Sequence, residues 1–192
     1  LAWDAPGYGA SQALASEAPV AAEYAQALAR WLDALGVARC VLVGHSLGTL
    51  VAAAFAQAHP GRVTQLILAA SACGYQVPAG QEMPPKVAAR IEDLARLGPQ
   101  EFARTRAPRL VYAPEQNADL LARVEQAMSQ VNPVGYGQAV HMLASGDLPG
   151  TLAEVTVPCG FILGRHDGVS PPAQPMRAGI SPTSCSRPRP SS

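Results

Sequence analysis

Val41-Leu-Val-Gly-His-Ser-Leu-Gly48 is the stretch that decides the fold of this 192-residue chain. An apolar run typical of a buried strand leads directly into a serine that has a glycine two residues before it and two residues after it. An alanine-rich helical pattern follows. This order predicts a nucleophile elbow, in which a strand turns sharply into a helix and leaves one hydroxyl exposed at the bend. Ser46 is therefore the predicted nucleophile.

The residues beside the serine have predicted roles of their own. We expect Gly44 and Gly48 to be required, because so tight a turn brings backbone close enough to collide with any side chain at either position. The Leu47 amide lies at the start of the helix, where the positive end of the helix dipole stabilises an oxyanion, so it is the predicted backbone donor. The alternative is a chance match in a glycine-rich chain. The strand and helix patterns on either side argue against it.

The composition describes one ordinary domain with enough apolar material for a core, at 48% hydrophobic and 15% charged residues. The formal net charge is zero, which argues against nucleic acid or an anionic membrane as partner, and no run is long and apolar enough to span a bilayer. The four cysteines, which lack metal-ligand spacing, are expected to be free thiols in a reducing compartment: Cys40, Cys73, Cys159 and Cys185. This predicts a cytoplasmic location, and no oligomeric state follows.

Strand and helix patterns alternate around the elbow and then give way to helices alone. Strands are predicted over 40–43, 63–70 and 155–164, and helices over 20–35, from 47 onward, and around 87–94 and 120–131. The fold class is therefore α/β, with a mostly parallel sheet, helices on both faces and a helical cap insertion. The alternative for the cap is a set of ordinary crossover helices. The predicted parts are a core at 1–73, a cap at 74–150, a second core part at 151–173 and an atypical, disordered tail at 174–192.

Three separated segments of the chain resemble the alpha/beta-hydrolase superfamily. They are Trp3-Asp-Ala-Pro-Gly-Tyr-Gly-Ala-Ser11, Val43-Gly-His-Ser-Leu-Gly48 with the later Ala-His59-Pro-Gly-Arg-Val63, and the stretch from Val157-Pro158 to Asp167. Within the superfamily the chain is most similar to the serine hydrolases of the enol-lactonase and carbon–carbon-bond hydrolase branch. The resemblance implies Ser46 as nucleophile, Asp167 as triad acid, no metal or organic cofactor, and a chain that is incomplete at both ends.

An acid at residue 167 has a chemical reason. A carboxylate at the carboxyl end of a parallel strand accepts a hydrogen bond from the imidazole that activates the serine, and it stabilises the positive form of that imidazole. The alternative for Asp167 is a loop aspartate that orders its own turn. Asp147, between Gly146 and Pro149, is a weaker rival for the same role.

The general base is not identified from the sequence. The resemblance implies a histidine beyond the acid, but residues 174–192 contain none. We expect the His45 side chain to point away from Ser46, since strand neighbours alternate faces, and we expect His59 to end the elbow helix far from its start. His166 and His141 are weak candidates for the base. His45, Tyr8 and His141 are the predicted substrate-binding residues.

The predicted function is hydrolysis of a small carboxylic ester, lactone or related carbonyl substrate through an acyl-enzyme on Ser46. Because no base is found and the family's second oxyanion donor would precede Leu1, we expect this chain to be weakly active or inactive. The alternative is a non-catalytic remnant or binding scaffold of the same fold. An arginine cluster beside Phe102 is expected either to hold a substrate carboxylate or to form a solvated helix face: Arg104, Arg106 and Arg109.

Overall fold

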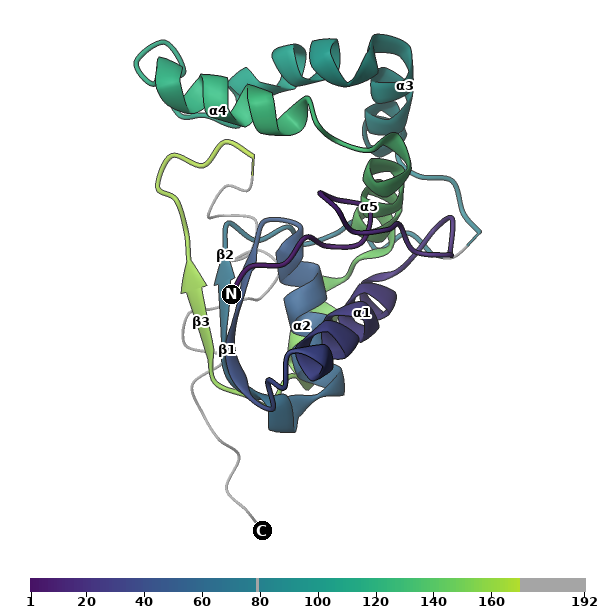
Figure 1. Ribbon diagram of the computed structural model, residues 1–192, viewed down its shortest axis with the longest axis vertical. Helices are drawn as coiled ribbons and strands as arrows, with labels where there is room; N and C mark the ends of the chain where they lie inside the picture. Colours follow the sequence, from purple (N-terminus) through teal and green to yellow (C-terminus); the bar gives the residue numbers. More distant parts are fainter. Residues whose placement is uncertain (79, 170–192) are drawn as a thin grey trace. The chain divides into compact units, whose positions relative to one another are not determined.

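The computed structural model describes residues 1–78 and 80–169 of the chain (Figure 1). They form two compact units, which we call unit 1 (Leu1–Pro19 and Val77–Ala144) and unit 2 (Val20–Gln76 and residues 145–169). The predicted tail at 174–192 lies outside the described residues. The predicted division into core and cap stays a prediction.

Unit 2 is built on a parallel sheet of three strands in the order β1-β2-β3 (Figure 1). The strands are β1 (Cys40–His45), β2 (Val63–Ala69) and β3 (Cys159–Ile162). At their carboxyl ends His45 lies opposite Ala69, and Ala69 lies opposite Ile162. Because these carboxyl ends are aligned, the loops after all three strands lie at one edge of the sheet. The predicted α/β class with a parallel sheet is confirmed.

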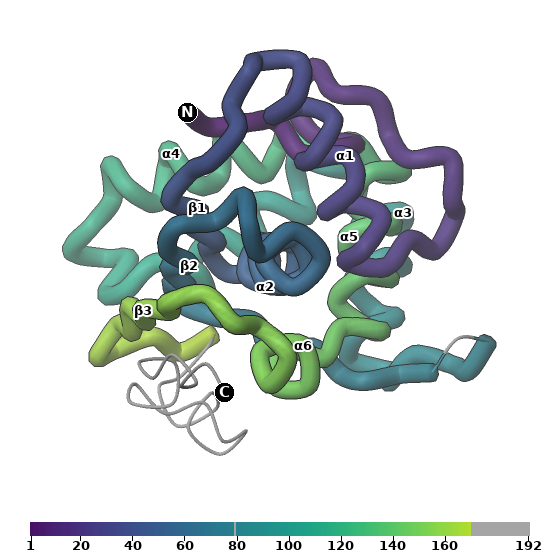
Figure 2. The backbone as a smooth tube through the Cα atoms, turned by 90° about the horizontal axis from the view of Figure 1, so that it is seen from below, coloured from purple at the N-terminus to yellow at the C-terminus, as the bar shows by residue number. Residues whose placement is uncertain are grey.

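Helix α2 is the centre of unit 2. Its bounds are Gly48–Ala58, and it packs on β1 and β2 and against α1 (Ala21–Ala34) and α6 (Leu148–Glu154), as Figure 2 shows. Eight of its eleven residues are buried, from Thr49 to Ala56. A helix that is apolar on nearly every side needs neighbours on every side, and the sheet and two helices supply them.

The apolar spacing of residues 20–35 predicts one buried face made of Tyr24, Leu28, Trp31, Leu32 and Leu35, and Trp31 is only partly buried. Tyr24, Leu28 and Leu32 are buried, but Leu35 is 49% exposed. Leu35 is the C-cap, and Gly36 after it has a φ of 66°. The chain therefore leaves the helical path before Leu35 joins the buried face, which is why the prediction is wrong there.

The helices of unit 2 lie on one side of the sheet (Figures 1 and 2). Successive side chains of a strand point to opposite faces, so Val41 and Val43 lie on the other side, where they are 52% and 59% exposed. Ile162 of β3 is 59% exposed. A second covering layer is not found among residues 1–78 and 80–169.

Unit 1 is helical. It contains α3 (Pro85–Arg106), the short η2 (Ala107–Arg109), α4 (Ala118–Met128) and α5 (Pro133–Ser145). Helix α3 is broken at Gly98, whose φ is 72°, and Pro99 follows. Glycine tolerates this left-handed conformation and proline lacks the amide that would continue the hydrogen-bond ladder. No helix in the described part of the chain has the length and apolar character needed to cross a bilayer.

The amino-terminal segment of unit 1 is fixed to α5. The buried Gln138 side chain donates from Nε2 to the carbonyls of Leu14 and Ser16, both at 2.7 Å, and accepts from the Leu14 amide at 3.1 Å. Gly7 and Gly135 approach so closely that a Cβ on either would collide with the backbone of the other. Backbone contact of this kind requires glycine at both positions.

Candidate active site

Ser46 lies immediately after β1 with a backbone conformation that is unusual for its residue type. Its φ is 50°, in the left-handed region that residues with a Cβ seldom adopt, and it is partly exposed. Helix α2 begins two residues later. The strand, the strained residue and the helix follow in the order that the motif predicts.

Both backbone polar groups of Ser46 are held. The Ser46 amide donates to the Ala69 carbonyl at 2.9 Å. The Ser46 carbonyl accepts from Thr49 Oγ1 at 2.6 Å, from the Thr49 amide at 3.1 Å and from the Ala72 amide at 3.3 Å. Sequence reasoning missed Thr49. The available signal was a hydroxyl residue in the first turn of the predicted helix, three positions after the serine.

The two glycines of the motif differ in what they do. A Cβ on Gly44 would lie 2.7 Å from the Gly48 carbonyl oxygen and 2.8 Å from Thr49 Cα. The close approach of β1 to α2 therefore requires glycine there, as predicted. A Cβ on Gly48 would meet nothing within 4 Å. The predicted collision at Gly48 is wrong, because that residue lies in the first turn of α2 and faces open space.

The amides at the start of α2 are the predicted oxyanion donors. Leu47 is the N-cap of the helix, and the amides of Ser46, Thr49 and Leu50 already bond to carbonyls. Among the described residues the Leu47 amide has no backbone acceptor. An unbonded amide at a helix start suits an anion, since the helix dipole adds to the hydrogen bond.

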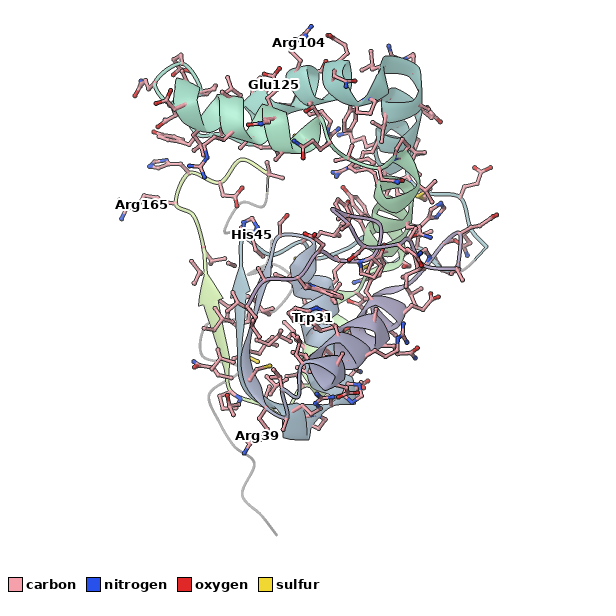
Figure 3. All side chains as sticks on the ribbon, in the orientation of Figure 1. Trp31, Arg39, His45, Arg104, Glu125 and Arg165 are labelled. Atoms are coloured by element: carbon pink, nitrogen blue, oxygen red, sulfur yellow. The ribbon has the colours of Figure 1, made fainter. Side chains whose placement is uncertain are left out.

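The acid loop follows β3 at the same edge of the sheet. Asp167 is partly exposed, its amide donates to the Gly164 carbonyl at 3.2 Å, and its Oδ1 accepts from the Val169 amide at 2.9 Å. Asp167 thus orders its own turn, which was the alternative reading. A carboxylate accepts several hydrogen bonds, so this contact is compatible with a second role. Arg165 of the same loop points away from the sheet (Figure 3).

The sheet order separates the serine from the acid loop by one strand. β1 and β3 lie on either side of β2, so their ends are two strand spacings apart, about 10 Å. Ser46 begins the loop after β1, and Asp167 lies five residues beyond Ile162 at the end of β3. An imidazole that is hydrogen-bonded to a serine hydroxyl on one side and to a carboxylate on the other bridges a distance of this size.

Asp147 has a structural role. It is the N-cap of α6, where its Oδ1 accepts from the Gly150 amide and from Gln76 Nε2, both at 3.0 Å. Its carbonyl accepts from Thr151 Oγ1 at 2.7 Å. A carboxylate committed to a helix cap is a poor rival for the triad acid.

The four histidines of the sequence lie in different settings. His45 ends β1, is exposed, and shares the sheet face of Val41 and Val43 (Figure 3). His59 stacks on Phe55 with ring centroids 4.9 Å apart, at the far end of α2 and roughly 16 Å along its axis. His166 lies in the acid loop, and His141 lies on α5 in unit 1.

Tyr8 also lies in unit 1, where its amide donates to the Ala5 carbonyl at 2.9 Å. The substrate-binding roles of Tyr8, His45 and His141 stay predictions.

Two of the three cap arginines have intramolecular partners. Arg104 binds Glu101 at 2.7 Å and lies 3.9 Å from Glu125, and Arg106 lies over the Phe102 ring at 5.2 Å. These contacts favour the solvated-face interpretation over a substrate carboxylate site for this pair.

Cys40 and Cys73 are free thiols among the described residues. Cys73 is buried, and burial raises the pKa of its thiol. Cys185 lies outside the described residues.

Two buried hydroxyls stand out. Among the described residues, neither Ser71 Oγ nor Tyr24 Oη has a hydrogen-bond partner. Ser71 lies between Ala70, whose φ is 46°, and Ala72, whose amide bonds to Ser46. The turn after β2 is therefore strained and packed against the elbow.

Comparison with known families gives the class of protein. A parallel sheet with a serine at a left-handed turn after one strand and an acid after a later strand is the arrangement of the alpha/beta-hydrolase superfamily. The profile of the family described as serine aminopeptidase, S33, matches residues 1–179. The chain belongs to this family and so to the alpha/beta-hydrolase superfamily.

Solved structures and one curated protein are similar to the chain. The enol-lactonase from Burkholderia xenovorans LB400 superimposes with a TM-score of 0.79 at 23% identity, over 91% of this chain and 65% of that one. An esterase from Thermogutta terrifontis, solved with malate bound, gives 0.76 at 26% identity, over 91% and 64%. A 2-hydroxy-6-oxononadienedioate/2-hydroxy-6-oxononatrienedioate hydrolase of Burkholderia vietnamiensis is 39% identical over 71 residues, which are 37% of this chain and 25% of that protein. The chain thus spans less than two thirds of the length of these relatives.

Proposed function

We propose that the protein is a serine hydrolase in which Ser46 attacks a carboxylic ester, lactone or related carbonyl and forms an acyl-enzyme. Asp167 orients the base, and the Leu47 amide binds the oxyanion. The observation that carries the proposal is the left-handed, partly exposed Ser46 between β1 and the start of α2. A strained residue at a strand-to-helix turn is typical of an activated nucleophile.

The similar proteins guide the choice of substrates. An enol-lactonase and an esterase among the solved structures favour a cyclic or linear carboxylic ester. The curated relative is named as a hydrolase of unsaturated hydroxy-oxo dicarboxylates, and the family is described as a serine aminopeptidase. A substrate panel therefore contains an activated ester, a lactone, a vinylogous diketo acid and an aminoacyl anilide.

We expect slow turnover. None of the four histidines follows Asp167 in the sequence, where the resemblance implies the general base. A serine hydroxyl without a base is a poor nucleophile. A small-molecule substrate and a cytoplasmic location complete the proposal, and the free thiols of Cys40 and Cys73 support that location. The competing function is a binding scaffold of the same fold that has lost its chemistry.

A fluorophosphonate probe tests the nucleophile, because it reacts only with an activated serine. We expect labelling at Ser46, lost in Ser46→Ala and kept in Ser129→Ala, which removes an exposed serine hydroxyl of unit 1. Peptide mapping of the labelled protein checks the site. A folded protein that takes no label at Ser46 contradicts the proposal and favours the binding scaffold.

The substitution Asp167→Asn separates the two roles of the acid. An amide oxygen still accepts from the Val169 amide, so the turn survives, but the negative charge that stabilises an imidazolium is lost. We expect labelling of Ser46 to slow at least about tenfold. An unchanged rate at wild-type thermal stability shows that Asp167 only orders its loop.

A further inference from the structure

We propose that Thr49 is a positioning residue for the nucleophile: its side-chain hydroxyl holds the Ser46 carbonyl and so keeps Ser46 in its left-handed conformation. This inference rests on the proposed role of Ser46. It assigns a function to a residue outside the serine, acid and oxyanion donors.

The Thr49 hydroxyl makes the shortest of the contacts to the Ser46 backbone. Its Oγ1 lies 2.6 Å from the Ser46 carbonyl oxygen, against 3.1 Å for the Thr49 amide and 3.3 Å for the Ala72 amide. A distance of 2.6 Å lies well within the range of O–H···O bonds, whereas 3.1 Å and 3.3 Å lie at and beyond the long end of the N–H···O range. The side chain, and not only the first helical turn, therefore holds this carbonyl.

The Thr49 side chain is fully buried. Thr49 is 0% exposed, and its hydroxyl lies between two carbonyl oxygens, that of Ser46 at 2.6 Å and that of Ala72 at 3.4 Å. A hydroxyl has one hydrogen to donate, and the distances assign it mainly to Ser46. Losing the hydroxyl leaves the Ser46 carbonyl with the two longer amide contacts alone, at 3.1 Å and 3.3 Å.

Holding this carbonyl fixes the torsion angles of Ser46. The Ser46 amide is already bound to the Ala69 carbonyl at 2.9 Å, which fixes the peptide plane before the serine. The Thr49 hydroxyl fixes the plane after it. A residue with a Cβ stays in the left-handed conformation only when several contacts hold it there. The hydrogen bonds to the two peptide planes on either side of Ser46 are such contacts.

The direction of the serine side chain depends on those two planes. Rotation of either plane moves Ser46 Oγ relative to the Leu47 amide, the predicted oxyanion donor. A displacement of about 1 Å in a catalytic group can cost up to a hundredfold in rate. Loss of the Thr49 hydroxyl is therefore expected to slow reaction at Ser46, an effect that loss of a similar hydrogen bond elsewhere in the protein does not have.

The test compares the full chain with Thr49→Val, which keeps the shape and removes the hydroxyl, and Thr49→Ser, which keeps the hydroxyl. Thr151→Val is the matched control, because Thr151 Oγ1 also donates from the first turn of a helix to a backbone carbonyl, at 2.7 Å. The readouts are the fluorophosphonate labelling rate of Ser46 per folded molecule and the thermal midpoint of unfolding.

We expect Thr49→Val to label about tenfold more slowly or worse, with Thr49→Ser within about threefold of wild type. Thr151→Val is expected to label at the wild-type rate although it loses a similar hydrogen bond. If Thr49→Val labels as fast as wild type, the inference is wrong. If Thr49→Val does not fold, Thr49→Ala and Thr49→Ser differ by the hydroxyl alone, and equal rates for that pair overturn the inference.

Hydrogen exchange gives a readout that does not depend on reactivity. The Ser46 amide is bonded to Ala69, so we expect it to exchange faster in Thr49→Val than in wild type or Thr151→Val. Unchanged protection contradicts the inference. An unlabelled wild type contradicts the proposed function, and the exchange comparison still decides whether Thr49 holds the elbow.

Discussion

Helices α2 and α4 are both eleven residues long, and their surroundings differ completely. Eight residues of α2 are buried, whereas none of α4 is. Helix α2 packs on two strands and two helices, and α4 packs on α3 and the short η2. Yet α4 carries the clearer amphipathic pattern in the sequence, with Leu120, Leu121, Val124 and Met128 on one stripe.

The difference shows that an apolar stripe predicts a helix more reliably than it predicts burial. The stripe of α4 marks a helix, but no residue of that helix is buried and Leu120 is 48% exposed. The sequence of α2 is apolar on nearly every side, and the helix lies directly after β1, between the sheet and the helices α1 and α6. Burial depends on how many neighbouring elements reach a helix.

Truncation of one leucine in each helix gives the largest expected effect. Leu50 in α2 is 3% exposed, so Leu50→Ala is expected to lower the free energy of unfolding by about 2–5 kcal/mol. Leu120→Ala in α4 removes the same atoms from a half-exposed site and is expected to cost less than about 1 kcal/mol. Thermal or urea unfolding measures both. Equal losses of stability in the two variants would show that the two helices do not differ in burial as we describe.

The close approach of α2 to β1 is tested by a pair of glycine substitutions. A Cβ at Gly44 would lie 2.9 Å or less from three atoms of α2, so Gly44→Ala is expected to destabilise by about 1–3 kcal/mol. Gly48→Ala places the same methyl in open space within a helix, where alanine is favoured by about 0.5–1 kcal/mol. A destabilising Gly48→Ala together with a neutral Gly44→Ala would reverse our assignment of the two glycines.

The buried hydroxyl of Tyr24 in α1 is expected to lower the stability of the protein by a smaller amount. Tyr24 is 1% exposed, and its hydroxyl has no partner among the described residues. Tyr24→Phe is therefore expected to raise the free energy of unfolding by about 1 kcal/mol at pH 7. Denaturant unfolding checks the sign, and a less stable variant would show that the hydroxyl is satisfied.

The same substitution has a pH dependence. Burial, and then the charge of Glu23, raises the pKa of Tyr24 from 10.0 to about 12. The folded protein holds this proton more tightly than the unfolded chain, so its contribution to stability is complete below pH 10 and is lost as the pH rises to about 12. The advantage of Tyr24→Phe over wild type is thus expected to grow between pH 10 and 12. A constant difference across that range would show that the pKa is not raised.

Much of the fold was predictable because it depends on short stretches of sequence. The spacing of apolar residues located α1, α2 and the strands, and His59-Pro-Gly61 marked the end of α2. The errors have two causes. Leu35 follows the last turn of α1, where Gly36 turns the chain away, and Val41 and Val43 lie on a sheet face that the described residues leave uncovered.

The candidate site was predictable in part. The motif located Ser46, and the strand before Asp167 located the acid loop. The sequence did not show that Gly48 faces open space, that Asp147 caps α6, or that the Thr49 hydroxyl donates to the Ser46 carbonyl. Each of these depends on which atoms surround the residue once the chain is folded.

The sequence by itself determined the strand, turn and helix around Ser46, because backbone sterics and apolar periodicity act over a few residues. Only the tertiary structure decided what holds the serine in its strained conformation, since the Ala69 carbonyl and the Ala72 amide come from the end of a different strand. Local preferences place a turn in the chain, but hydrogen bonds and burial from distant segments determine the geometry of the turn.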